Sequence, residues 1–402
     1  MANETAIEDR VIQLGPGLSA IPERLLLAHA RGEVLFICGA GVSQPAGLPG
    51  FRQLVLNVYA TLDTSTHSVL AGLPPGACNH WLANCADLTD RQTAEVRRFI
   101  QGDYDVVLGM LERRLDDQTR GDSQVRRTVA TILRSGAASP APIHKALIAL
   151  AERGGAKTIV TTNFDLLLQV AAKRLRSPVE TYSLGSIPRP SRSPEFSGVL
   201  HIHGALDKSP TRTSELVVSD QDFGEFYLRR RVVPDFIYDA ARLYHLVLVG
   251  YSANDPPMRY LLNAVAADGN RFDDLKERFT FFGTTSPDAV ALADWNGRGI
   301  TPVHYDSTNG HTALRTTLEK WAALSAINGK KETIDAELRR IVKLSRSAAK
   351  ESDRDLFDHF FRRSNASERV RLSALVSDAK AEIGWLDAVV KVCAEADRGR
   401  KP

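Results

Sequence analysis

The sequence of 402 residues contains few cysteines and no Cys-x-x-Cys pair. The four cysteines, Cys38, Cys78, Cys85 and Cys393, are too few and too scattered to form a disulfide framework in a chain of this length. Cys78 and Cys85 lie close to His80, but their spacing matches no common zinc pattern and a fourth ligand is missing. We therefore expect these side chains to serve ordinary packing and to bind no metal.

The sequence also lacks a long apolar run and a strong excess of charge of either sign. No apolar segment approaches the roughly 20 residues that span a bilayer, which excludes a membrane-spanning protein. Lysine and arginine number 51 against 48 acidic residues, so the net charge is only +3 and direct nucleic-acid binding is not expected. The hydrophobic content of 43% excludes disorder throughout. The first residues lack the features of a signal peptide, which indicates a cytoplasmic protein.

Six short apolar runs recur along the sequence, and most of them end at glycine or at a small polar residue. Such runs are typical of the buried strands of a parallel sheet. Helix-period stretches lie between several of them, at 144–151, 236–244 and 257–267. This alternation predicts an α/β fold with a Rossmann-like, doubly wound parallel sheet, whose ligands bind outside the carboxyl ends of the strands. The six runs are Glu33–Cys38, Lys157–Thr161, Val199–His203, His245–Val249, Phe279–Phe282 and Ile300–His304.

Other segments of the sequence do not show this alternation of strands and helices. Residues 1–29 are expected to form an arm, polar over its first 20 residues, and then a helix, and residues 30–326 the α/β domain. Within that domain, residues 65–138 show apolar residues at helical spacing and no clear strand, which predicts a helical insertion. Residues 187–197 are rich in proline and serine and predict a loop. Residues 327–402 predict a small all-helical unit, whose 17 basic and 13 acidic residues suit a solvated surface.

The first chemistry-bearing segment runs from Cys38 to Arg52 and reads Cys-Gly-Ala-Gly-Val-Ser-Gln-Pro-Ala-Gly-Leu-Pro-Gly-Phe-Arg. A strand that runs into Gly-x-Gly and then a helix places free backbone N–H groups and a helix N-terminus against a phosphate. Ser43 is expected to cap that helix and to bond the phosphate. The usual dinucleotide fingerprint has a third glycine where this chain has Gln44, so a plain tight turn stays open as the alternative.

Polar side chains follow two further strands. Asn163 and Asp165 are expected to face the ligand crevice, although Asn163 also suits an Asx turn or a helix cap. His203 lies next to Gly204 at a strand end, where a neutral imidazole with an ordinary pKa near ~6.5 is suited to be a general base. His201 shares its face of the strand and is expected to support His203.

A fourth segment, 250–256, reads Gly-Tyr-Ser-Ala-Asn-Asp-Pro and again places small polar residues between a strand and a helix. Ser252 and Asn254 can reach ribose hydroxyls or phosphate, whereas Asp255 suits an ordinary helix cap. Each of the four segments is ambiguous alone. Four such segments in this order, each at the end of a strand, are much harder to explain as turns.

With this combination the chain resembles the sirtuin family over residues 30–325. The resemblance rests on the segments Gly39-Ala40-Gly41-Val42-Ser43, Gly47-Leu48-Pro49-Gly50-Phe51-Arg52, Thr161-Thr162-Asn163-Phe164-Asp165, His203-Gly204 and Gly250-Tyr251-Ser252. It implies an NAD-binding Rossmann-like domain with Asn163 and His203 at the catalytic positions. The other positions that it implies for NAD binding are Gly39, Ala40, Gly41, Ser43, Phe51, Arg52, Thr162, Asp165, Gly250, Ser252 and Asn254.

Departures from the protein-deacylating sirtuins point to another branch of the family. Those enzymes usually hold zinc with two Cys-x-x-Cys pairs, of which this chain has none. Thr162 stands where those enzymes have glutamine, and Gly50 stands where they have an acidic residue. The Phe-Asp, His-x-His-Gly and Gly-Tyr-Ser-x-Asn-Asp-Pro forms instead resemble the bacterial sirtuin-like proteins of antiphage defence, which degrade NAD. A core with a short helical tail is most similar to the subunit that partners a HerA-type hexameric ATPase.

The resemblance implies an NAD glycohydrolase, for which NAD is the substrate. Nicotinamide leaves as a neutral molecule, so the reaction needs no general acid of the kind that glycosidases use. In this hypothesis Asn163 holds the ribose hydroxyls or the attacking water, and His203 accepts a proton. Asp165 holds the nicotinamide amide or offsets positive charge at the ribose. Ser43 and the backbone of residues 39–41 hold the pyrophosphate.

A free NADase would poison its own cell, so we expect control through a homo-oligomer or through the ATPase partner. Two alternatives stay open, namely NAD-dependent protein deacylation and non-catalytic sensing of NAD or ADP-ribose. The absent zinc module counts against the first, and the presence of Asn163 and His203 counts against the second. A further alternative, nucleic-acid binding by residues 327–402, would require steeply salt-dependent binding.

Overall fold

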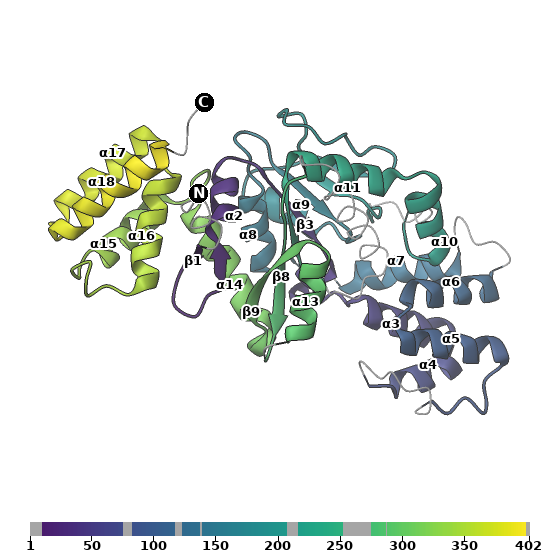
Figure 1. The fold of residues 1–402 in the computed structure, drawn as a ribbon. Helices are drawn as coiled ribbons and strands as arrows, with labels where there is room; N and C mark the ends of the chain where they lie inside the picture. Colours follow the sequence, from purple (N-terminus) through teal and green to yellow (C-terminus); the bar gives the residue numbers. More distant parts are fainter. Residues whose placement is uncertain are drawn as a thin grey trace.

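The computed structural model describes residues 10–74, 83–116, 123–136, 139–206, 216–251, 275–286 and 288–398. Its centre is a seven-stranded parallel sheet covered by helices on both faces (Figure 1), which confirms the predicted fold class. The strand order is β5-β6-β4-β3-β7-β8-β9. All strands except β5 coincide with the six predicted apolar runs. Their bounds are β3 Val34–Cys38, β4 Thr158–Thr161, β5 Thr181–Ser183, β6 Gly198–His201, β7 His245–Val249, β8 Arg278–Thr284 and β9 Ile300–Asp306.

The strand order defines where a ligand can bind. When β5 is set aside, the remaining strands lie in the order 3-2-1-4-5-6 of their succession along the chain, which is the order of dinucleotide-binding folds. The first strand, β3, thus lies between β4 and β7, and the winding direction reverses between β3 and β7. Ligands of open α/β sheets bind outside the carboxyl ends of the strands at such a switch point.

Alternate side chains of the central strands pack on opposite faces of the sheet. In β3, Phe36 and Cys38 belong to one apolar cluster and Leu35 and Ile37 to another. All five residues of β3 are buried, as expected for a parallel strand that is covered on both sides. The first cluster includes α2 (Glu23–Ala30), α8 (Pro142–Leu150), α9 (Leu167–Arg174) and α14 (Thr308–Leu324), and the second includes α11 (Val232–Leu243) and α13 (Ala289–Gly297).

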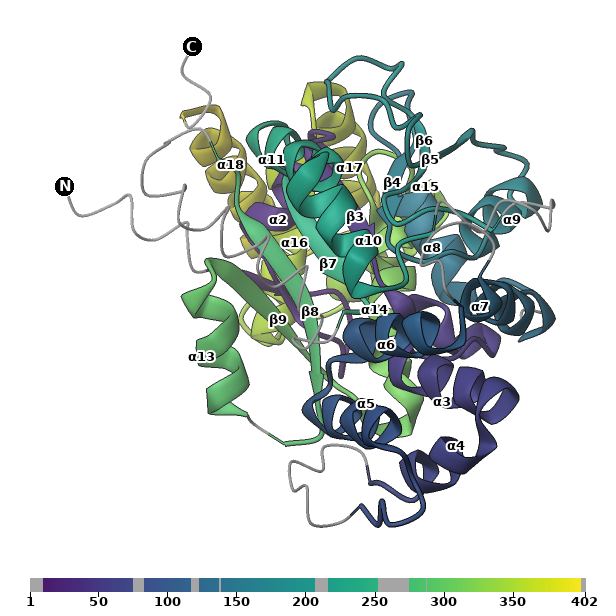
Figure 2. The same cartoon turned by 90° about the vertical axis from the view of Figure 1, so that its right-hand side faces the viewer.

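A layer of helices lies at one end of the molecule, next to the segment that follows β3 (Figures 1 and 2). It consists of α3 (Phe51–Leu62), α4 (Thr64–Ala71), α5 (Asp90–Gln101), α6 (Tyr104–Leu115) and α7 (Gln124–Gly136). These helices share an apolar cluster that includes Val55, Phe99 and Leu111. The insertion predicted for residues 65–138 is helical where it is described, and α3 belongs to the same layer because it packs against α4, α6 and α7.

The first described residues form a hairpin where the sequence predicts only a polar arm. β1 (Val11–Gln13) and β2 (Ala20–Pro22) pair antiparallel, with Ile12 opposite Ile21. Both isoleucines are buried in the apolar cluster that also contains α2 and helices of the C-terminal unit. Gly15, Pro16 and Gly17 therefore lie in the connection between two strands.

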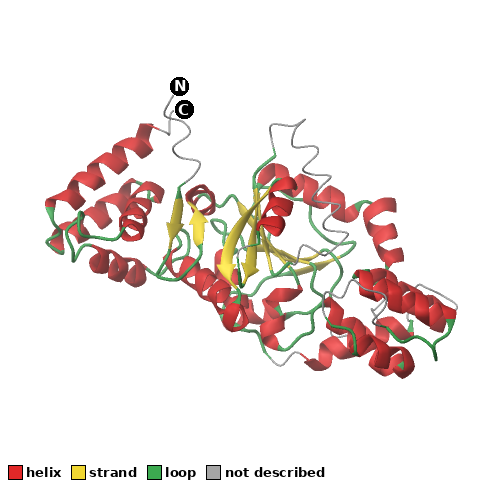
Figure 3. Ribbon diagram, turned by 60° about the horizontal axis from the view of Figure 1, so that its bottom comes forward, coloured by secondary structure: helices red, strands yellow, loops and turns green. Residues whose placement is uncertain are grey.

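The C-terminal unit lies at the opposite end of the molecule from the helical layer and is entirely helical where it is described (Figures 1 and 3). Its helix α16 packs against β1 and α2. Glu23, at the start of α2, is buried and contacts His359 and Arg362 of α16. No helix in the described ranges has the length and apolar character that crossing a bilayer requires. The helices of the unit are α15 (Lys331–Ile341), α16 (Glu351–Arg363), α17 (Ala366–Asp378) and α18 (Ile383–Arg398).

Candidate active site

A cavity of about 770 Å³ opens at the switch point of the sheet. Its lining comes from the segments that follow β3, β4, β6 and β7, from helices α3, α6 and α7, from the starts of α8 and α14, and from Val217 and Phe223. The volume lies within the range of about 300–1,000 Å³ that is usual for ligand and cofactor sites. Ten of the predicted site residues line this cavity, namely Ala40, Gly41, Ser43, Phe51, Arg52, Thr162, Asn163, Asp165, His203 and Gly250.

Three glycines bring the backbones after β3 and β7 into direct contact. The N–H of Gly41 donates to the carbonyl oxygen of Gly250 at 2.9 Å, and a Cβ added at Gly39 would stand 2.7 Å from that oxygen. Gly250 has a φ of +74°, and a Cβ there would stand 2.6 Å from the backbone nitrogen of Val42. No side chain fits at this contact unless the backbone moves. The glycines therefore build the bottom of the crevice by close packing.

The sequence analysis predicts that the chain runs from Gly41 directly into a helix, but the structure shows a different path. Residues 40–42 and 44–46 form two short 3-10 turns, and α3 begins only at Phe51. Gly47 ends the second turn in the left-handed region, with a φ of 93°. The side chain of Ser43 makes no capping hydrogen bond, so the prediction that it caps a helix is wrong. The two turns place Ser43 in the cavity wall instead.

Asn163 is held in place by its side-chain amide. Its Nδ2 donates to the carbonyl oxygen of Gly39 and to Oγ of Ser43, each at 3.0 Å. Its backbone N–H donates to Oγ1 of Thr161, also at 3.0 Å. Both amide hydrogens are therefore used within the protein. Nothing within the described ranges donates to Oδ1, so this oxygen is the group that Asn163 offers to a ligand.

A partly buried polar cluster lies beside this amide. Oγ of Ser43 donates to Oδ2 of Asp165 at 2.8 Å and lies 3.5 Å from Nε2 of His144. Oδ1 of Asp165 accepts the N–H of Leu167 at 3.0 Å, so the carboxylate also fixes the turn before α9. Burial lowers the pKa of His144, although Asp165 opposes the shift. The sequence analysis missed His144, because nothing in a helix-period stretch marks one histidine as a neighbour of Ser43.

His203 lines the cavity on the side of β6. Its Nε2 lies 2.6 Å from the hydroxyl oxygen of Tyr227, and the ring of Phe223 packs edge-on against it at 5.5 Å. The N–H of Val217 donates to its carbonyl oxygen at 2.9 Å. His203 is 5% exposed, and burial lowers the pKa of its imidazole to about 3. The ring is therefore neutral near pH 7.

The register of the sheet explains why Asn163 and His203 share one cavity. Thr161 of β4 is paired with His201 of β6, and each predicted catalytic residue lies two positions further along its chain segment. Parallel strands end at the same edge of a sheet, so the two following segments leave it side by side. Both side chains line the cavity. The structure thus brings the two residues together at the predicted crevice.

His201 has a different neighbour from the one that the sequence analysis predicts. Its Nδ1–H donates to the carbonyl oxygen of Asn163 at 2.8 Å, and its Nε2 accepts from Nε2 of Gln169 at 2.6 Å. The side chain is fully buried, and burial lowers its pKa. His201 therefore fixes the backbone of Asn163, and the support expected for His203 comes from elsewhere in the fold.

The helical layer supplies an aromatic wall. The rings of Phe51 and Tyr104 meet edge to face, with 5.8 Å between their centres. Nη2 of Arg52 donates to the carbonyl oxygen of Leu73 at 2.6 Å, and the guanidinium carbon lies 5.2 Å from the ring centre of Phe99. Arg52 thus lines the cavity while its guanidinium is anchored in the layer. The sequence analysis missed Tyr104, because α6 reaches the cavity only through packing of the whole insertion.

The start of α14 supplies further lining residues that the sequence analysis missed. Asn309, Gly310 and His311 all have positive φ, between 57° and 62°. The hydroxyl oxygen of Tyr305 lies 2.9 Å from Nδ1 of His311, and burial raises the pKa of Tyr305 to about 12. Arg315 adds a positive charge to the lining. The Asn-Gly pair is a turn signal that could have drawn attention to this segment.

The predicted residues after β7 are described only in part. The hydroxyl oxygen of Tyr251 lies 3.0 Å from Oγ1 of Thr162, which joins the ends of β7 and β4. Ser252 and Asn254 lie outside the described residues, and Cys78 and His80 do so as well. Within the described ranges, no group of three or more His, Cys, Asp or Glu side chains could hold a metal ion. The expectation of no metal stays a prediction.

Comparisons with known proteins agree with this geometry. Residues 157–303, which include Asn163, His203 and Gly250, match the model of the SIR2-like domain. The chain is 33% identical over 378 residues to the uncharacterized protein y4cA of Sinorhizobium fredii; the match covers 88% of this chain but only 28% of the length of that relative.

A solved structure titled "Structural Basis for the Mechanism and Regulation of Sir2 Enzymes" is 15% identical, with a TM-score of 0.33, and the match covers 75% of this chain and 96% of that one. This likeness adds nothing to the argument from the family model. The SIR2-like match supports an NAD-related function of the sirtuin type. Residues 157–303 are therefore the part of the chain that is similar to the SIR2-like domain.

Proposed function

We propose that this protein hydrolyses NAD at the bond between nicotinamide and ribose and releases nicotinamide and ADP-ribose. One observation carries the proposal: Asn163 and His203 follow adjacent strands of the sheet and line one cavity of cofactor size. The cavity lies at the switch point, where dinucleotides bind in sheets of this order. The match of residues 157–303 to the SIR2-like domain supports NAD as the ligand.

In the proposed reaction the C–N bond between the ribose carbon and the pyridinium nitrogen breaks, and its electron pair stays with nitrogen. Nicotinamide therefore leaves as a neutral molecule, and the ribose carbon passes through an oxocarbenium-like state. The oxygen of a water molecule bonds to that carbon, and the water gives up a proton. Since the leaving group takes up no proton, the site needs no carboxylic acid to donate one.

We assign to His203 the role of accepting the proton that the water gives up. Burial keeps its imidazole neutral, so the ring does not repel the positive charge that develops on the ribose carbon. A pKa of about 3 makes the ring a weak base before the ligand arrives. We expect the negative charge of bound NAD to favour the imidazolium and to raise this pKa toward the range in which general bases work.

The remaining roles follow the contacts of each side chain. Oδ1 of Asn163 accepts from the ribose hydroxyls or from the attacking water, because Nδ2 is anchored. The carboxylate of Asp165, which Ser43 and Leu167 hold in place, can bind the nicotinamide amide. We assign the pyrophosphate to Ser43 and the backbone of residues 39–41, and the adenosine to Ser252 and Asn254, as the sequence resemblance implies.

We also propose a cellular role, which is antiphage defence by depletion of NAD. An enzyme that consumes a central metabolite requires control, and we propose control by a homo-oligomer or by a HerA-type hexameric ATPase. Helical units flank the α/β domain at both ends of the molecule (Figure 1), which supports the proposal because they offer surfaces for a partner beside the sheet.

Nicotinamide release from NAD tests the proposed reaction. Asn163→Ala and His203→Ala are each expected to lower the rate by roughly 100-fold or more while thermal unfolding stays cooperative. Asn296→Ala and His304→Ala are matched controls, because both side chains are exposed and outside the cavity lining. Full activity in both cavity variants would overturn the assignment.

The products distinguish the proposed reaction from its alternatives. Mass analysis is expected to show that one ADP-ribose forms for each nicotinamide released. Acetyl transfer that follows the concentration of an added acetylated peptide would replace hydrolysis with deacylation. Tight NAD binding without turnover, also in a complete assembly with its partner, would make the protein a sensor.

A further inference from the structure

His203 is held by one chain segment that is not part of the sheet. The segment runs from Leu216 through α10 (Asp220–Phe223) and the π-helix η4 (Gly224–Arg229). It contacts His203 at three points, which are the N–H of Val217, the ring of Phe223 and the hydroxyl of Tyr227. We call residues 216–227 the covering segment. Its position decides where the imidazole points.

The covering segment has little regular structure of its own. α10 is a single turn, and the six residues of η4 form a π-helix, a geometry that is uncommon outside functional sites. Isolated turns of this length are not stable in water. The segment must therefore be held by contacts with another part of the fold.

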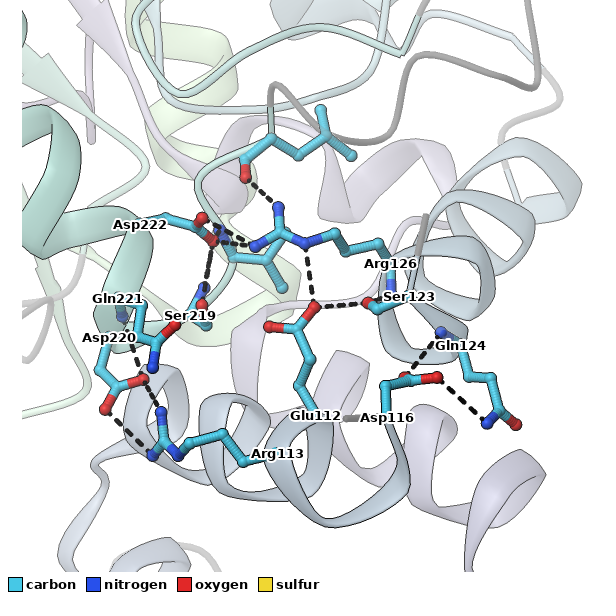
Figure 4. A network of polar contacts seen from close by, with 12 residues as sticks. Glu112, Arg113, Asp116, Ser123, Gln124, Arg126, Ser219, Asp220, Gln221 and Asp222 are labelled. Carbon is cyan, nitrogen blue, oxygen red and sulfur yellow. Dashed lines mark hydrogen bonds and ion pairs between the residues drawn. The ribbon is translucent and has the colours of Figure 1, made fainter. Parts of the chain in front are cut away.

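Those contacts come from Arg126 of α7, in the helical layer (Figure 4). Its Nη1 donates to the carbonyl oxygen of Leu216 at 2.8 Å, and its Nη2 lies 2.7 Å from both carboxylate oxygens of Asp222. Its Nε donates to Oε1 of Glu112 at 3.0 Å. The Arg126 side chain is 1% exposed. We call Arg126, Glu112 and Asp222 the Arg126 cluster.

The Arg126 cluster is well satisfied by hydrogen bonds, as Figure 4 shows. Asp222 also accepts the backbone N–H groups of Val218 and Ser219, each at 2.9 Å, which ties the carboxylate to the start of α10. Within the described ranges, none of the cluster's side-chain polar atoms is buried without a partner. Burial disfavours the charge of Arg126, but Asp222 and Glu112 outweigh that effect and raise its pKa. Such a network fixes geometry, because any displacement leaves a buried charge unpaired.

A second feature shows how closely the covering segment docks on the layer. Gly109 of α6 faces Asp220, and a Cβ added at Gly109 would stand 2.0 Å from Oδ1 of that carboxylate. Arg113, one turn further along α6, binds the same carboxylate through both terminal nitrogens, at 3.1 and 3.2 Å. The absence of a side chain at Gly109 thus lets α10 approach α6 directly.

We infer that Arg126 is a positioning residue for His203, which acts through the covering segment and couples the helical layer to the catalytic imidazole. The inference rests on the proposed function for the role of His203, but the contacts that carry it do not. A displacement of about 1 Å in a reacting group can cost roughly 100-fold in rate. A change in the helical layer therefore reaches the reaction through this cluster.

The test compares Arg126→Met with Arg114→Met in the full-length protein. Arg114 is a matched control, because it also binds two carboxylates, those of Asp63 and Glu95, but it lies within the layer and contacts no residue of the covering segment. The first readout is the rate at which diethyl pyrocarbonate modifies His203, followed by peptide mass spectrometry. The second readout is kcat and KM for nicotinamide release.

In Arg126→Met, we expect His203 to react about 10-fold faster, because local opening exposes a ring that is covered in the wild type. We expect kcat to fall by roughly 10- to 100-fold, with KM within about threefold of the wild type. Arg114→Met is expected to leave both readouts within about twofold. Arg126→Lys, which restores the charge but not the fork of donors, is expected to recover part of the protection of His203.

Unchanged protection of His203 in a folded Arg126→Met protein would overturn the inference, and so would equal exposure in Arg114→Met. If Arg126→Met does not fold, Asp222→Asn carries the same test, because it keeps the shape of the cluster and removes one charge. If the wild type releases no nicotinamide, the proposed function fails. The rates at which diethyl pyrocarbonate modifies His203 still test whether the helical layer is coupled to His203. If the wild type is active and the protection does not change, only the coupling fails.

Discussion

Two buried ionic clusters join helical parts of this molecule to the α/β domain, and they differ in what they hold. The Arg126 cluster joins the helical layer to the segment that covers His203. The second, which we call the Glu23 cluster, consists of Glu23, His359 and Arg362 and joins α2 to the C-terminal unit. The same kind of interaction thus holds the segment over His203 at one end and attaches a helical unit at the other.

The two clusters also differ in how completely their polar atoms are paired. Oε2 of Glu23 and Nε of Arg362 are buried and have no hydrogen-bond partner among the described residues, unlike the side-chain polar atoms of the Arg126 cluster. Apolar packing of α16 against β1 and α2 compensates for this, since Ile12, Phe357 and Phe360 belong to one buried cluster. An attachment can rest on packing, whereas a fixed imidazole needs directional bonds.

The largest expected effect comes from the Glu23 cluster. Glu23→Ala leaves Arg362 buried without its carboxylate, so we expect the free energy of unfolding to fall by about 3–5 kcal/mol. Nicotinamide release per folded molecule is expected to stay unchanged, because the cluster does not line the cavity. Urea unfolding and an activity assay measure the two quantities. Arg31→Gln, which removes an exposed ion pair with Glu33, is the control. Loss of activity as large as in Arg126→Met would remove the distinction between the clusters.

A smaller effect concerns acid stability. Burial lowers the pKa of His29 to about 4, whereas the unfolded chain titrates near ~6.5. Between these values the unfolded chain binds a proton that the folded chain does not, so the free energy of unfolding falls as the pH drops below ~6.5, by about 2 kcal/mol at pH 5 for this histidine. His29→Gln is expected to flatten the urea-unfolding dependence between pH 7 and 5 by that amount. Parallel curves for variant and wild type would contradict this expectation.

A third prediction tests the contact between the hydroxyl of Tyr227 and His203. Tyr227→Phe removes the hydroxyl beside Nε2 of His203 and keeps the packing of the ring. A hydrogen bond of this kind contributes about 1 kcal/mol, so we expect kcat to fall roughly fivefold with little change in KM. Tyr238→Phe on α11, which is outside the cavity lining, is the matched control. An equal fall of kcat in both variants would deny Tyr227 a specific role.

The smallest effect is expected at the exposed pair of Arg113 and Asp220. Both side chains are about one-third exposed, and such pairs contribute about 0–1 kcal/mol. Arg113→Gln is therefore expected to change the free energy of unfolding by less than about 1 kcal/mol, and the difference is expected to shrink in 1 M salt, where the Debye length is about 3 Å. If Arg113→Gln exposes His203 as much as Arg126→Met does, the docking of α10 depends on the pair of Arg113 and Asp220 and not on the Arg126 cluster.

Much of the sheet could be predicted from the sequence, because its signals are local. The run Val34–Cys38 is apolar throughout, and a strand that is buried on both faces requires that pattern. The strand Thr181–Ser183 escaped prediction, because it is short, polar and at the edge of the sheet. The β1–β2 hairpin escaped prediction as well, since its burial depends on α16, which comes more than 300 residues later.

The same division applies to the candidate site. Asn163 and His203 could be predicted, because each follows an apolar strand directly and the order of such segments is a sequence feature. Arg126 and Asp222 could not, because they meet across 96 positions of the chain and an arginine on an amphipathic helix is usually expected to be solvent-exposed. Ser43 was found, but the helix cap predicted for it is wrong, since its bond to Asp165 depends on the fold.

The glycine contact between Gly41 and Gly250 has a consequence for synthesis. The bottom of the crevice is complete only when β7 has taken its place beside β3, and β7 comes late in the chain. A ribosome that makes this protein from its N-terminus therefore releases no finished nucleotide pocket until most of the polypeptide has emerged. Copies that stall before β7 therefore lack the bottom of the crevice, and the part of the lining that comes from the start of α14 is made later still.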